Sequence, residues 1–319
     1  MKLSTTTSSL VALFALGCFA VCPLAQAVLP RPDGGYPGGN TAEGSAALLS
    51  LTNGTFNTAV GFFALRSNTE GQLNTGIGAG ALLANVGDPA TSQGIQNTAT
   101  GAGALLSNTT GTANTGNGTF ALLSNTTGDH NTATGAFALQ DNITGRSNIA
   151  EGAFALQHNL TGGFNVAVGF GALLFNTSGG DNTAVGTNAL ALNTEGNFNT
   201  GIGEFALVNN TSGESNTAVG DDALGHNTTA DNNTAVGSDA LFFNTLGASN
   251  TAGGAFALEQ NTTGNNNTAV GVTALSSNMN SSFGMRPSTS PRSGIPHLAP
   301  KPSFNAQSMI GAEPVFMPA

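Results

Sequence analysis

The sequence predicts an all-β fold, a parallel β-solenoid or β-roll of about fourteen coils with 17 residues each. The main observation is a unit with the consensus N-T-A-V-G-x-x-A-L-x-x-N-T-T-G-x-x. It recurs fourteen times at a fixed period, and a fixed short period indicates a stacked array. The unit is shorter than the roughly 33 to 47 residues of helical-hairpin repeats and lacks a leucine-rich pattern. β-Structure is the architecture that remains.

The repeat domain spans residues 40–283, and its period is broken once. A six-residue insertion lies near residues 86–93, around Asp88, between Asn85 and Gly94. Positions within a coil are counted from the first residue of the consensus. The copies begin at Asn40, Asn57, Asn74, Asn97, Asn114, Asn131, Asn148, Asn165, Asn182, Asn199, Asn216, Asn233, Asn250 and Asn267.

Each copy contains two short runs that can extend, N-T-A-V at positions 1 to 4 and A-L-x-x at positions 8 to 11. Glycine holds position 5 in every copy, as expected for a corner that needs positive φ or close backbone approach. The N-T-T-G segment at positions 12 to 15 has the residues typical of a turn. We therefore expect two extended segments per coil, joined by a glycine corner and a turn.

Position 8 is Ala and position 9 is Leu in all fourteen copies, which predicts that these side chains form the core. Position 3 is always Ala or Gly, so it is expected to face inward where larger side chains cannot fit. By strand alternation the Asn at position 1 shares that face, which predicts an internal ladder of amides hydrogen-bonded along the stack. Position 4 ranges from Val60 to Glu43, and we expect it to be at least partly in water.

The first 27 residues have the three-part form of a secretory signal: Lys2, an apolar run from Leu10 to Val21, and a cleavage site that we place after Ala27. The apolar run is shorter than the roughly 20 residues that span a bilayer as a helix, so we expect no integral membrane segment in the mature chain. Acylation at Cys18, as in a lipoprotein, is the less favoured alternative.

The segments that flank the repeats differ from them in composition. We expect residues 28–39 to form a linker or partial cap, and residues 284–319, which hold seven of the twelve prolines, to form a disordered tail. Both cysteines, Cys18 and Cys22, lie within the signal, so we expect a secreted mature chain without disulfides. Hydrophobic burial and backbone hydrogen bonds must then hold it together.

Charge and motifs exclude several classes of function. Within the repeats only Arg66 and Arg146 are basic, against fifteen acidic residues, whereas binding a nucleic-acid backbone needs a basic stripe. No H-E-x-x-H, C-x-x-C, G-x-S-x-G or Walker sequence occurs. We therefore expect no enzyme activity and no catalytic, cofactor-binding or metal-binding residues. Calcium at an acidic turn such as residues 179–181 is a weaker alternative, because the nonapeptide calcium pattern is missing.

Phenylalanine recurs at position 7, and we interpret it as packing between coils or chains rather than as a stripe that grips a hydrophobic partner. Acidic residues at Asp221, Asp222 and Asp239 interrupt this stripe and predict a wet face there. The recurring residues are Phe63, Phe120, Phe137, Phe154, Phe205 and Phe256.

The repeats also contain histidines and glycosylation sequons. We expect His130, His158 and His226 to be solvated, since the last two share position 11 but lie four coils apart, too far for one metal. Sequons such as those at Asn108 and Asn125 would accept glycans in a eukaryotic secretory route, although turn chemistry also explains them.

At the N-T-A-V-G-x-x-A-L core, seen at residues 182–190 and 216–224, the chain resembles the YadA-like head repeats of trimeric autotransporter adhesins. The resemblance covers residues 40 to about 283. It implies a left-handed parallel β-roll in which three chains pack side by side on a bacterial surface and mediate attachment. The 17-residue repeat is longer than the family's usual unit. No heptad run or alternating strand series follows Phe283, so we expect neither a coiled-coil stalk nor a membrane-barrel anchor.

The leading hypothesis is a non-catalytic, adhesin-like homotrimer, secreted by the Sec route to the extracellular space or the bacterial cell surface. Its partners would be copies of itself and a host-matrix, glycan or abiotic surface, held through many weak contacts. A structural spacer or tail-fibre-like module is the main alternative. An ice-binding protein is a further one, suggested by the Thr at position 2 in twelve of fourteen copies.

Overall fold

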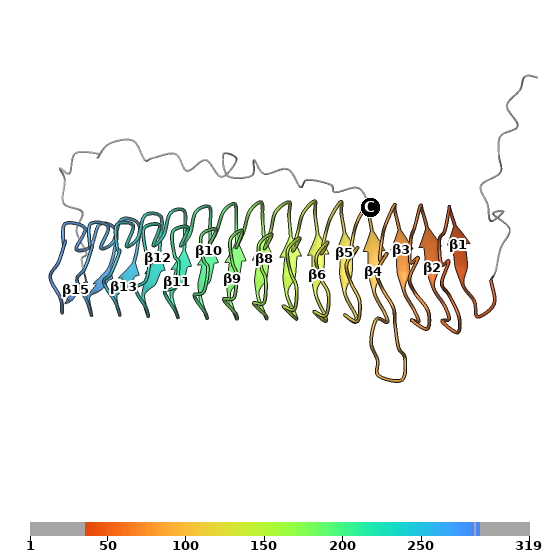
Figure 1. Cartoon of the computed structure of the whole chain (residues 1–319). Coiled ribbons are helices and arrows are strands. Elements are labelled where there is room, and N and C mark those ends of the chain that lie inside the picture. Colours follow the sequence, from red (N-terminus) through yellow and green to blue (C-terminus); the bar gives the residue numbers. More distant parts are fainter. Residues whose placement is uncertain (1–35, 284, 288–319) are drawn as a thin grey trace, which may run out of the picture.

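A computed structural model describes residues 36–283 and 285–287, and these form one long solenoid (Figure 1). Each coil contributes one short strand to a single parallel sheet that runs the length of the molecule. The fold class expected from the sequence is confirmed. The secretory signal and both cysteines lie outside the described residues, as does most of the proline-rich tail.

The sheet has fifteen strands, each three residues long, and each pairs with the strand of the next coil in chain order. Pairing is in register, so that Thr183 lies beside Thr200 and Val185 beside Ile202. The strands are β1 (Thr41–Glu43), β2 (Thr58–Val60), β3 (Thr75–Ile77), β4 (Thr98–Thr100), β5 (Thr115–Asn117), β6 (Thr132–Thr134), β7 (Ile149–Glu151), β8 (Val166–Val168), β9 (Thr183–Val185), β10 (Thr200–Ile202), β11 (Thr217–Val219), β12 (Thr234–Val236), β13 (Thr251–Gly253), β14 (Thr268–Val270) and β15 (Met285–Pro287).

Both ends of the stack extend slightly beyond the fourteen repeats. At the amino-terminal end, Tyr36 and Asn40 form an isolated antiparallel bridge, which closes a turn before β1. At the other end, β15 pairs with β14, although residues 285–287 belong to the tail that the sequence analysis expects to be disordered. The remaining residues of the expected linker and tail, 28–35 and 288–319, lie outside the described part of the chain.

The expectation of a second extended run at positions 8 to 11 is wrong. These residues form turns, and Leu at position 9 has a φ between 49° and 54° in all fourteen coils. The left-handed region is costly for a non-glycine residue and persists only where the surroundings determine it. Here the bend turns the Leu side chain into the core, so burial of the side chain offsets the cost of the backbone conformation.

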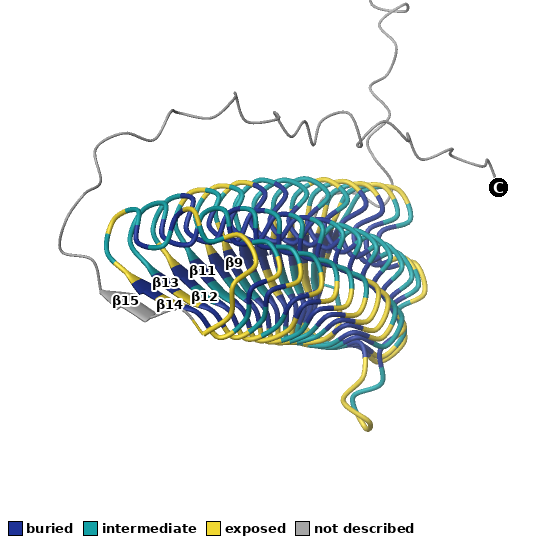
Figure 2. Cartoon of the chain, turned by 90° about the vertical axis from the view of Figure 1, so that its left-hand side faces the viewer, coloured by how far each residue is buried: buried dark blue, intermediate teal, exposed yellow. Residues whose placement is uncertain are grey.

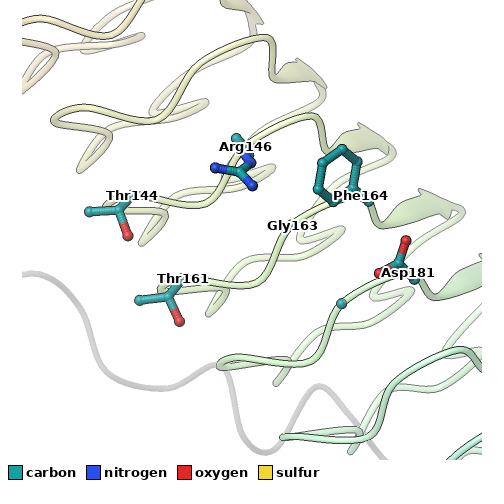
Figure 3. A pocket seen from close by; sticks show the side chains of 7 residues that line it. Thr144, Arg146, Thr161, Gly163, Phe164 and Asp181 are labelled. Carbon is teal, nitrogen blue, oxygen red and sulfur yellow. The ribbon is translucent and has the colours of Figure 1, made fainter.

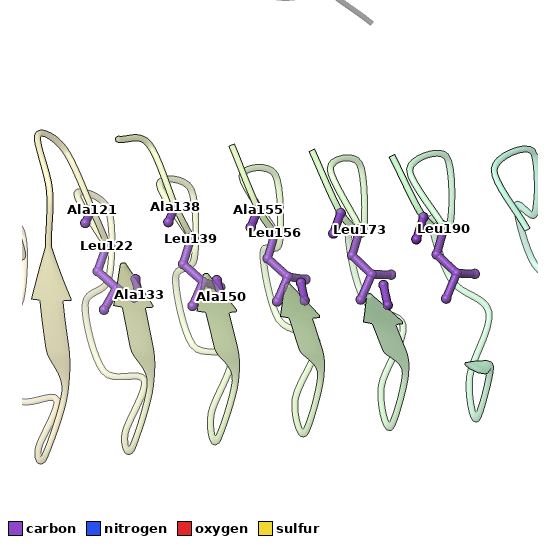
Figure 4. Packing of buried hydrophobic residues seen from close by; sticks show 14 of the residues in the cluster. Ala121, Leu122, Ala133, Ala138, Leu139, Ala150, Ala155, Leu156, Leu173 and Leu190 are labelled. Carbon is purple, nitrogen blue, oxygen red and sulfur yellow. The ribbon is translucent and has the colours of Figure 1, made fainter. Parts of the chain in front are cut away.

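The core is a set of stacked columns from positions 3, 8 and 9 (Figure 4). Ala150, Ala155 and Leu156 are fully buried, and the same positions repeat this burial along the array. The sequence prediction of an Ala and Leu core is therefore confirmed. Burying one Leu side chain contributes roughly 1.5–3 kcal/mol, so the core is thin and depends on repetition.

A column of fully buried Asn side chains at position 1 runs beside the strands, as the sequence predicts. At Asn165 the backbone N–H and the side-chain Nδ2 both donate to Asn148 Oδ1, at 3.0 and 3.2 Å. The same Nδ2 donates to Gly179 O at 2.9 Å, and Asn165 Oδ1 accepts from the Asn182 backbone N–H at 3.0 Å. Each amide is thus satisfied by the coils above and below it and by the position-15 carbonyl of its own coil.

A second buried Asn column, at position 12, was not anticipated from the sequence. Asn159 Nδ2 donates to Asn142 Oδ1 at 2.7 Å and to Gly162 O at 2.9 Å. The carbonyl of Gly162 also accepts from Asn148 Nδ2 at 2.9 Å, so the two columns meet at the position-15 carbonyl. The N-T-T-G segment is therefore a turn, as expected, whose Asn points into the coil.

The glycine at position 5 closes a corner in every coil. Gly254 has a φ of 128°, and a Cβ placed there would lie 2.7 Å from the carbonyl carbon and oxygen of Gly271 in the next coil. Gly253, one residue earlier, has space around it, with Val270 at 3.9 Å as the nearest group. The corner needs glycine for both its conformation and its close stacking.

The insertion forms a small hairpin that leaves the stack below β4 (Figure 1). Asp88 N–H donates to Gln93 O at 2.7 Å, and Gln93 N–H donates back at 2.9 Å. Gly94 then takes position 15, where its carbonyl accepts from Asn74 Nδ2 and Asn85 Nδ2, both at 2.9 Å. The insertion therefore leaves both Asn columns continuous.

Replacing one ladder amide should weaken the array. Asn165→Ala removes the side-chain bond to Asn148 Oδ1 and leaves the buried Asn182 N–H without its acceptor, while the Gly179 carbonyl keeps only Asn176 Nδ2 as a side-chain donor. We expect a loss of about 2 kcal/mol or more in unfolding free energy, measured by urea denaturation followed by circular dichroism. The exposed control Thr187→Ala should change it by less than about 0.5 kcal/mol. Equal effects of the two variants would contradict the role of the ladder.

Two adjacent glycines should respond differently to the same substitution. Gly254→Ala forces Ala into a φ of 128° and against the Gly271 carbonyl, so we expect it to lower the unfolding free energy by about 2 kcal/mol or more. Gly253→Ala should be neutral or slightly stabilising, because the site is open and Ala restricts the unfolded chain. Thermal unfolding of both variants tests this, and a stable Gly254→Ala protein would rule out the corner constraint.

Candidate functional site

The coil presents three outward surfaces, each built from the same positions in successive coils. The sheet face consists of positions 2 and 4, such as Thr183 and Val185. The aromatic face consists of positions 7, 10 and 11, and the turn face of positions 14, 16 and 17. Figure 2 shows how the exposed residues follow the outer rims of the coils while buried residues line the interior. Any binding site must lie on one of these surfaces or at an end of the stack.

The sheet face is flat, with few charges. Thr at position 2 is mostly half-buried, and aliphatic residues at position 4 remain accessible, with exposed fractions of 37% for Val185 and 47% for Val236. The row is aliphatic from Val168 to Val236, whereas Glu43, Gly253 and four consecutive polar residues, Thr100, Asn117, Thr134 and Glu151, interrupt it elsewhere. Position 4 therefore faces solvent, as the sequence predicts.

The aromatic face is largely packed against itself. Phe120, Phe137 and Phe154 form a stack along three coils, with ring centroids 5.7 and 5.3 Å apart. Phe205 packs against a second apolar cluster that contains Leu174. Phe63 instead stacks on Phe62, and Phe256 is half-buried. The interpretation of these rings as packing between coils is confirmed for the Phe120 to Phe154 stack.

The acidic residues that interrupt the aromatic face differ in environment. Asp221 is exposed and Asp222 half-buried, which agrees with the expected wet face. Asp239, however, is only 6% exposed, and Ser238 Oγ donates to its Oδ2 at 3.0 Å. The wet face therefore does not extend to Asp239.

Two of the three histidines are not simply solvated, which corrects the expectation. His158 Nδ1 lies 2.7 Å from Asp141 Oδ2, and its ring stacks on Phe175 with a centroid distance of 5.1 Å. His226 contacts Phe242 and Phe243, and burial lowers its pKa, while the nearby Asp222 carboxylate opposes the shift. His130 is exposed, as expected.

The sequons at Asn108 and Asn125 lie at position 12 and therefore in the second Asn column, whereas others, such as those at Asn53 and Asn117, have an exposed Asn. Asn108 is fully buried, and its Nδ2, the atom that a glycan would be attached to, donates to Asn85 Oδ1 and Gly111 O, both at 2.9 Å. Asn125 is buried in the same way. The folded array does not present these amides, which supports turn chemistry as the reason for the motif.

Within residues 36–283 and 285–287, no three His, Cys, Asp or Glu side chains gather as metal ligands would, so the calcium alternative at residues 179–181 gains no support. The described part of the chain also contains no helix of the length and apolarity needed to cross a bilayer.

A shallow notch of about 500 Å³ interrupts the turn face at its middle (Figure 3). Its floor is the backbone at Gly163 and Gly180, which both occupy position 16 in consecutive coils. Arg146 stands at one side, with its guanidinium carbon 5.5 Å from the centre of the Phe164 ring. The remaining wall residues are Thr144, Thr161 and Asp181.

This notch was missed from the sequence. Its signal was present in the pattern, because Gly163 and Gly180 follow directly after one of the two basic residues of the repeats at the same coil position. Glycine at position 16 could not be distinguished from the glycines of the corner and the turn, because position 16 is variable and directly follows the N-T-T-G turn.

A second hollow, of about 650 Å³, opens at the amino-terminal end of the stack. It is lined mostly by apolar groups, including Tyr36, Leu48 and Leu51. Leu51 stands where every later coil carries the position-12 Asn, so the column of amides ends here and the core reaches the surface. This hollow is the end of the core.

Comparison of the chain with family models, curated proteins and solved structures finds no match. The structure therefore establishes the solenoid fold by itself. The chemistry of the outward surfaces is the basis for what we propose about function.

His226 should titrate below its ordinary range. Burial lowers its pKa below the usual 6.5, so protonation of the ring is less favourable in the folded chain than in the unfolded chain. Its contribution to stability is then complete above pH 6.5 and is lost as the pH falls through the folded pKa. NMR titration of the His226 ring, with His226→Gln as the stability control at pH 5 and 7.5, measures this. A midpoint at or above 6.5 would contradict the burial effect.

Proposed function

We propose that this chain is a non-catalytic attachment protein that binds surfaces through its repeated outward side chains. The observation that carries the proposal is register. Strand pairing and both Asn columns fix each coil on the next, so the same outward position recurs at every coil along the sheet face. A weak contact made by one coil is then repeated at the coil spacing, about 4.8 Å.

Repetition converts weak contacts into attachment. When several contacts belong to one rigid body, the second and later ones form at high effective concentration, and avidity exceeds single-site affinity by orders of magnitude. The accessible aliphatic row at position 4 and the hydroxyls at position 2 suit contact with a flat partner, and the low charge limits the desolvation cost.

The proposed setting follows the resemblance to YadA-like head repeats. The chain would leave the cell by the Sec route, assemble as a homotrimer, and act outside the cell or at the bacterial cell surface. Sedimentation equilibrium of the chain from Val28 onward tests the trimer directly. A monomer would remove the support that the resemblance gives, without affecting the solenoid itself.

Attachment should depend steeply on the number of coils. Deleting residues 199–249 removes three whole coils and joins Phe198 to Asn250, which keeps the period and both Asn columns. We expect the shortened array to dissociate from a coated surface at least severalfold faster than the full array at equal molar coating. Surface plasmon resonance on immobilised matrix proteins and glycans, and a quartz microbalance for abiotic surfaces, measure this.

The control for this deletion is the stability of the shortened protein, which circular dichroism and thermal unfolding should show to be intact. Loss of attachment in strict proportion to the coils removed would contradict avidity. If neither array binds any surface while both stay folded, the chain is a structural spacer, the alternative with the same fold.

A further inference from the structure

The notch on the turn face lies in the row of backbone N–H groups at position 16, some of which are bonded by a side chain of the next coil. In several coils the side chain at position 16 accepts a hydrogen bond from the N–H of the position-16 residue one coil earlier. Asp129 Oδ1 accepts from Thr112 N–H and Asp231 Oδ1 from Glu214 N–H, both at 2.7 Å. Asn197 Oδ1 accepts from Gly180 N–H at 2.8 Å. This turn therefore has a place for a carboxylate or amide oxygen.

In the notch that place has no side chain to fill it. The residue one coil after Arg146 is Gly163, and the residue one coil after Gly163 is Gly180. Within the described part of the chain, the backbone N–H groups of Arg146 and Gly163 have no acceptor. The position-16 N–H groups of Asp129, Asn197 and Asp231 also lack acceptors among the described residues. What distinguishes the notch is that Gly163 and Gly180 place no side chain over the two free donors.

The notch contains one positive and one negative side chain, Arg146 and Asp181, and it is Arg146 that can hold an anion. Arg146 is one of two basic residues in the repeats, and it forms no ion pair among the described residues. Its guanidinium lies over the Phe164 ring and beside the glycine floor (Figure 3). A guanidinium and aligned backbone N–H groups are the usual ligands of a carboxylate in proteins.

We propose that the notch formed by Arg146, Gly163, Phe164 and Gly180 binds a carboxylated saccharide of the uronic acid type. The carboxylate would occupy the oxygen place beside the Arg146 and Gly163 N–H groups and face the guanidinium. This inference deepens the proposed attachment function and rests on it, since it names the ligand class that one part of the turn face selects.

The other walls of the notch fit a sugar rather than an acidic peptide or a phosphate. The Phe164 ring is 50% exposed and offers an apolar face for the C–H groups of a pyranose. Thr144 and Thr161 supply hydroxyls at the opposite side, and Asp181 can accept from a sugar hydroxyl. The Asp181 carboxylate repels a doubly charged phosphate more strongly than a singly charged uronate. The volume of about 500 Å³ lies within the range of small-ligand sites.

The test uses the full mature chain and a tetramer of galacturonic acid, with the fully methyl-esterified tetramer as the neutral match. Isothermal titration calorimetry and ligand-observed NMR measure binding. We expect the acidic tetramer to bind and the methyl ester to bind at least about tenfold more weakly, because the ester loses the charge that the guanidinium and N–H groups hold. Equal binding of both tetramers would overturn the assignment of a carboxylate site.

Gly163→Asn fills the notch with a side chain that the coil already accepts, since Asn197 and Asn265 occupy the same position. The backbone at Gly163 is not in the left-handed region, so the substitution imposes no φ strain. Its amide oxygen should accept from the Arg146 N–H as Asn197 does from Gly180, so we expect unchanged or raised thermal stability. Affinity for the acidic tetramer should fall at least about tenfold. Retained affinity would place binding elsewhere.

The two arginines provide a matched pair. Arg146→Gln should lower the affinity for the acidic tetramer about tenfold. Arg66→Gln removes the same charge from an arginine that lies over the Phe63 ring away from the notch, and it should change affinity by less than about twofold. Equal losses in both variants would show a general charge effect and overturn the site.

Two further outcomes keep this inference separate from the proposed function. A tetraglutamate peptide that binds as tightly as the acidic tetramer would overturn the saccharide assignment. If the full array attaches to surfaces but neither tetramer binds, the notch proposal fails while the attachment function stands. If the acidic tetramer binds but the array attaches to no surface, the reverse holds, and the chain is a soluble binder of acidic saccharide.

Discussion

The rest of the structure depends on the way buried amides are satisfied from one coil to the next. Each coil buries two Asn side chains in most of the array, and an isolated coil would keep only their bonds to its own position-15 carbonyl, leaving the amide oxygens without donors. Stacking supplies those partners, because each Oδ1 in the position-1 column accepts from the backbone or side chain of the following Asn. Since an unsatisfied buried amide costs about 1–3 kcal/mol, the ladders favour one register strongly. The thin Ala and Leu core would not do so alone.

The same constraint explains which changes the array accepts. The six-residue insertion is accommodated because Gly94 returns its carbonyl to the place where Asn74 and Asn85 both donate. The extra residues pair with each other outside the stack. Thr112 Oγ1, in the next coil, donates one hydrogen bond to Ser92 O. Length can therefore vary at the turn, whereas the columns on either side of it cannot shift.

The inward positions could be predicted from the sequence because each is occupied by one residue type that has a simple physical preference. Invariant Leu and Ala indicated the core, and strand alternation placed the first Asn beside it. The second Asn column could not be assigned in this way, because Asn is equally typical of an exposed turn. The left-handed Leu was also beyond prediction. No propensity favours it, and only the closure of the whole coil makes that conformation the one that buries the side chain.

The outward positions differ, because their residues vary from coil to coil and do not reveal their role through the consensus. Because the ladders and the core determine the fold, a substitution at position 4 or 16 has little structural consequence, and the repeat consensus says nothing about its role. A functional position can then be recognised where one coil lacks a stabilising side-chain interaction that other coils make at the same position. At Gly163 and Gly180 the coil gives up a side-chain acceptor that Asp129, Asn197 and Asp231 provide elsewhere. Two such losses in consecutive coils, beside an arginine without a carboxylate partner, leave donors that only an external oxygen can satisfy. In a solenoid of this kind, the absence of an expected side chain is therefore a stronger indication of a binding site than the presence of an unusual one.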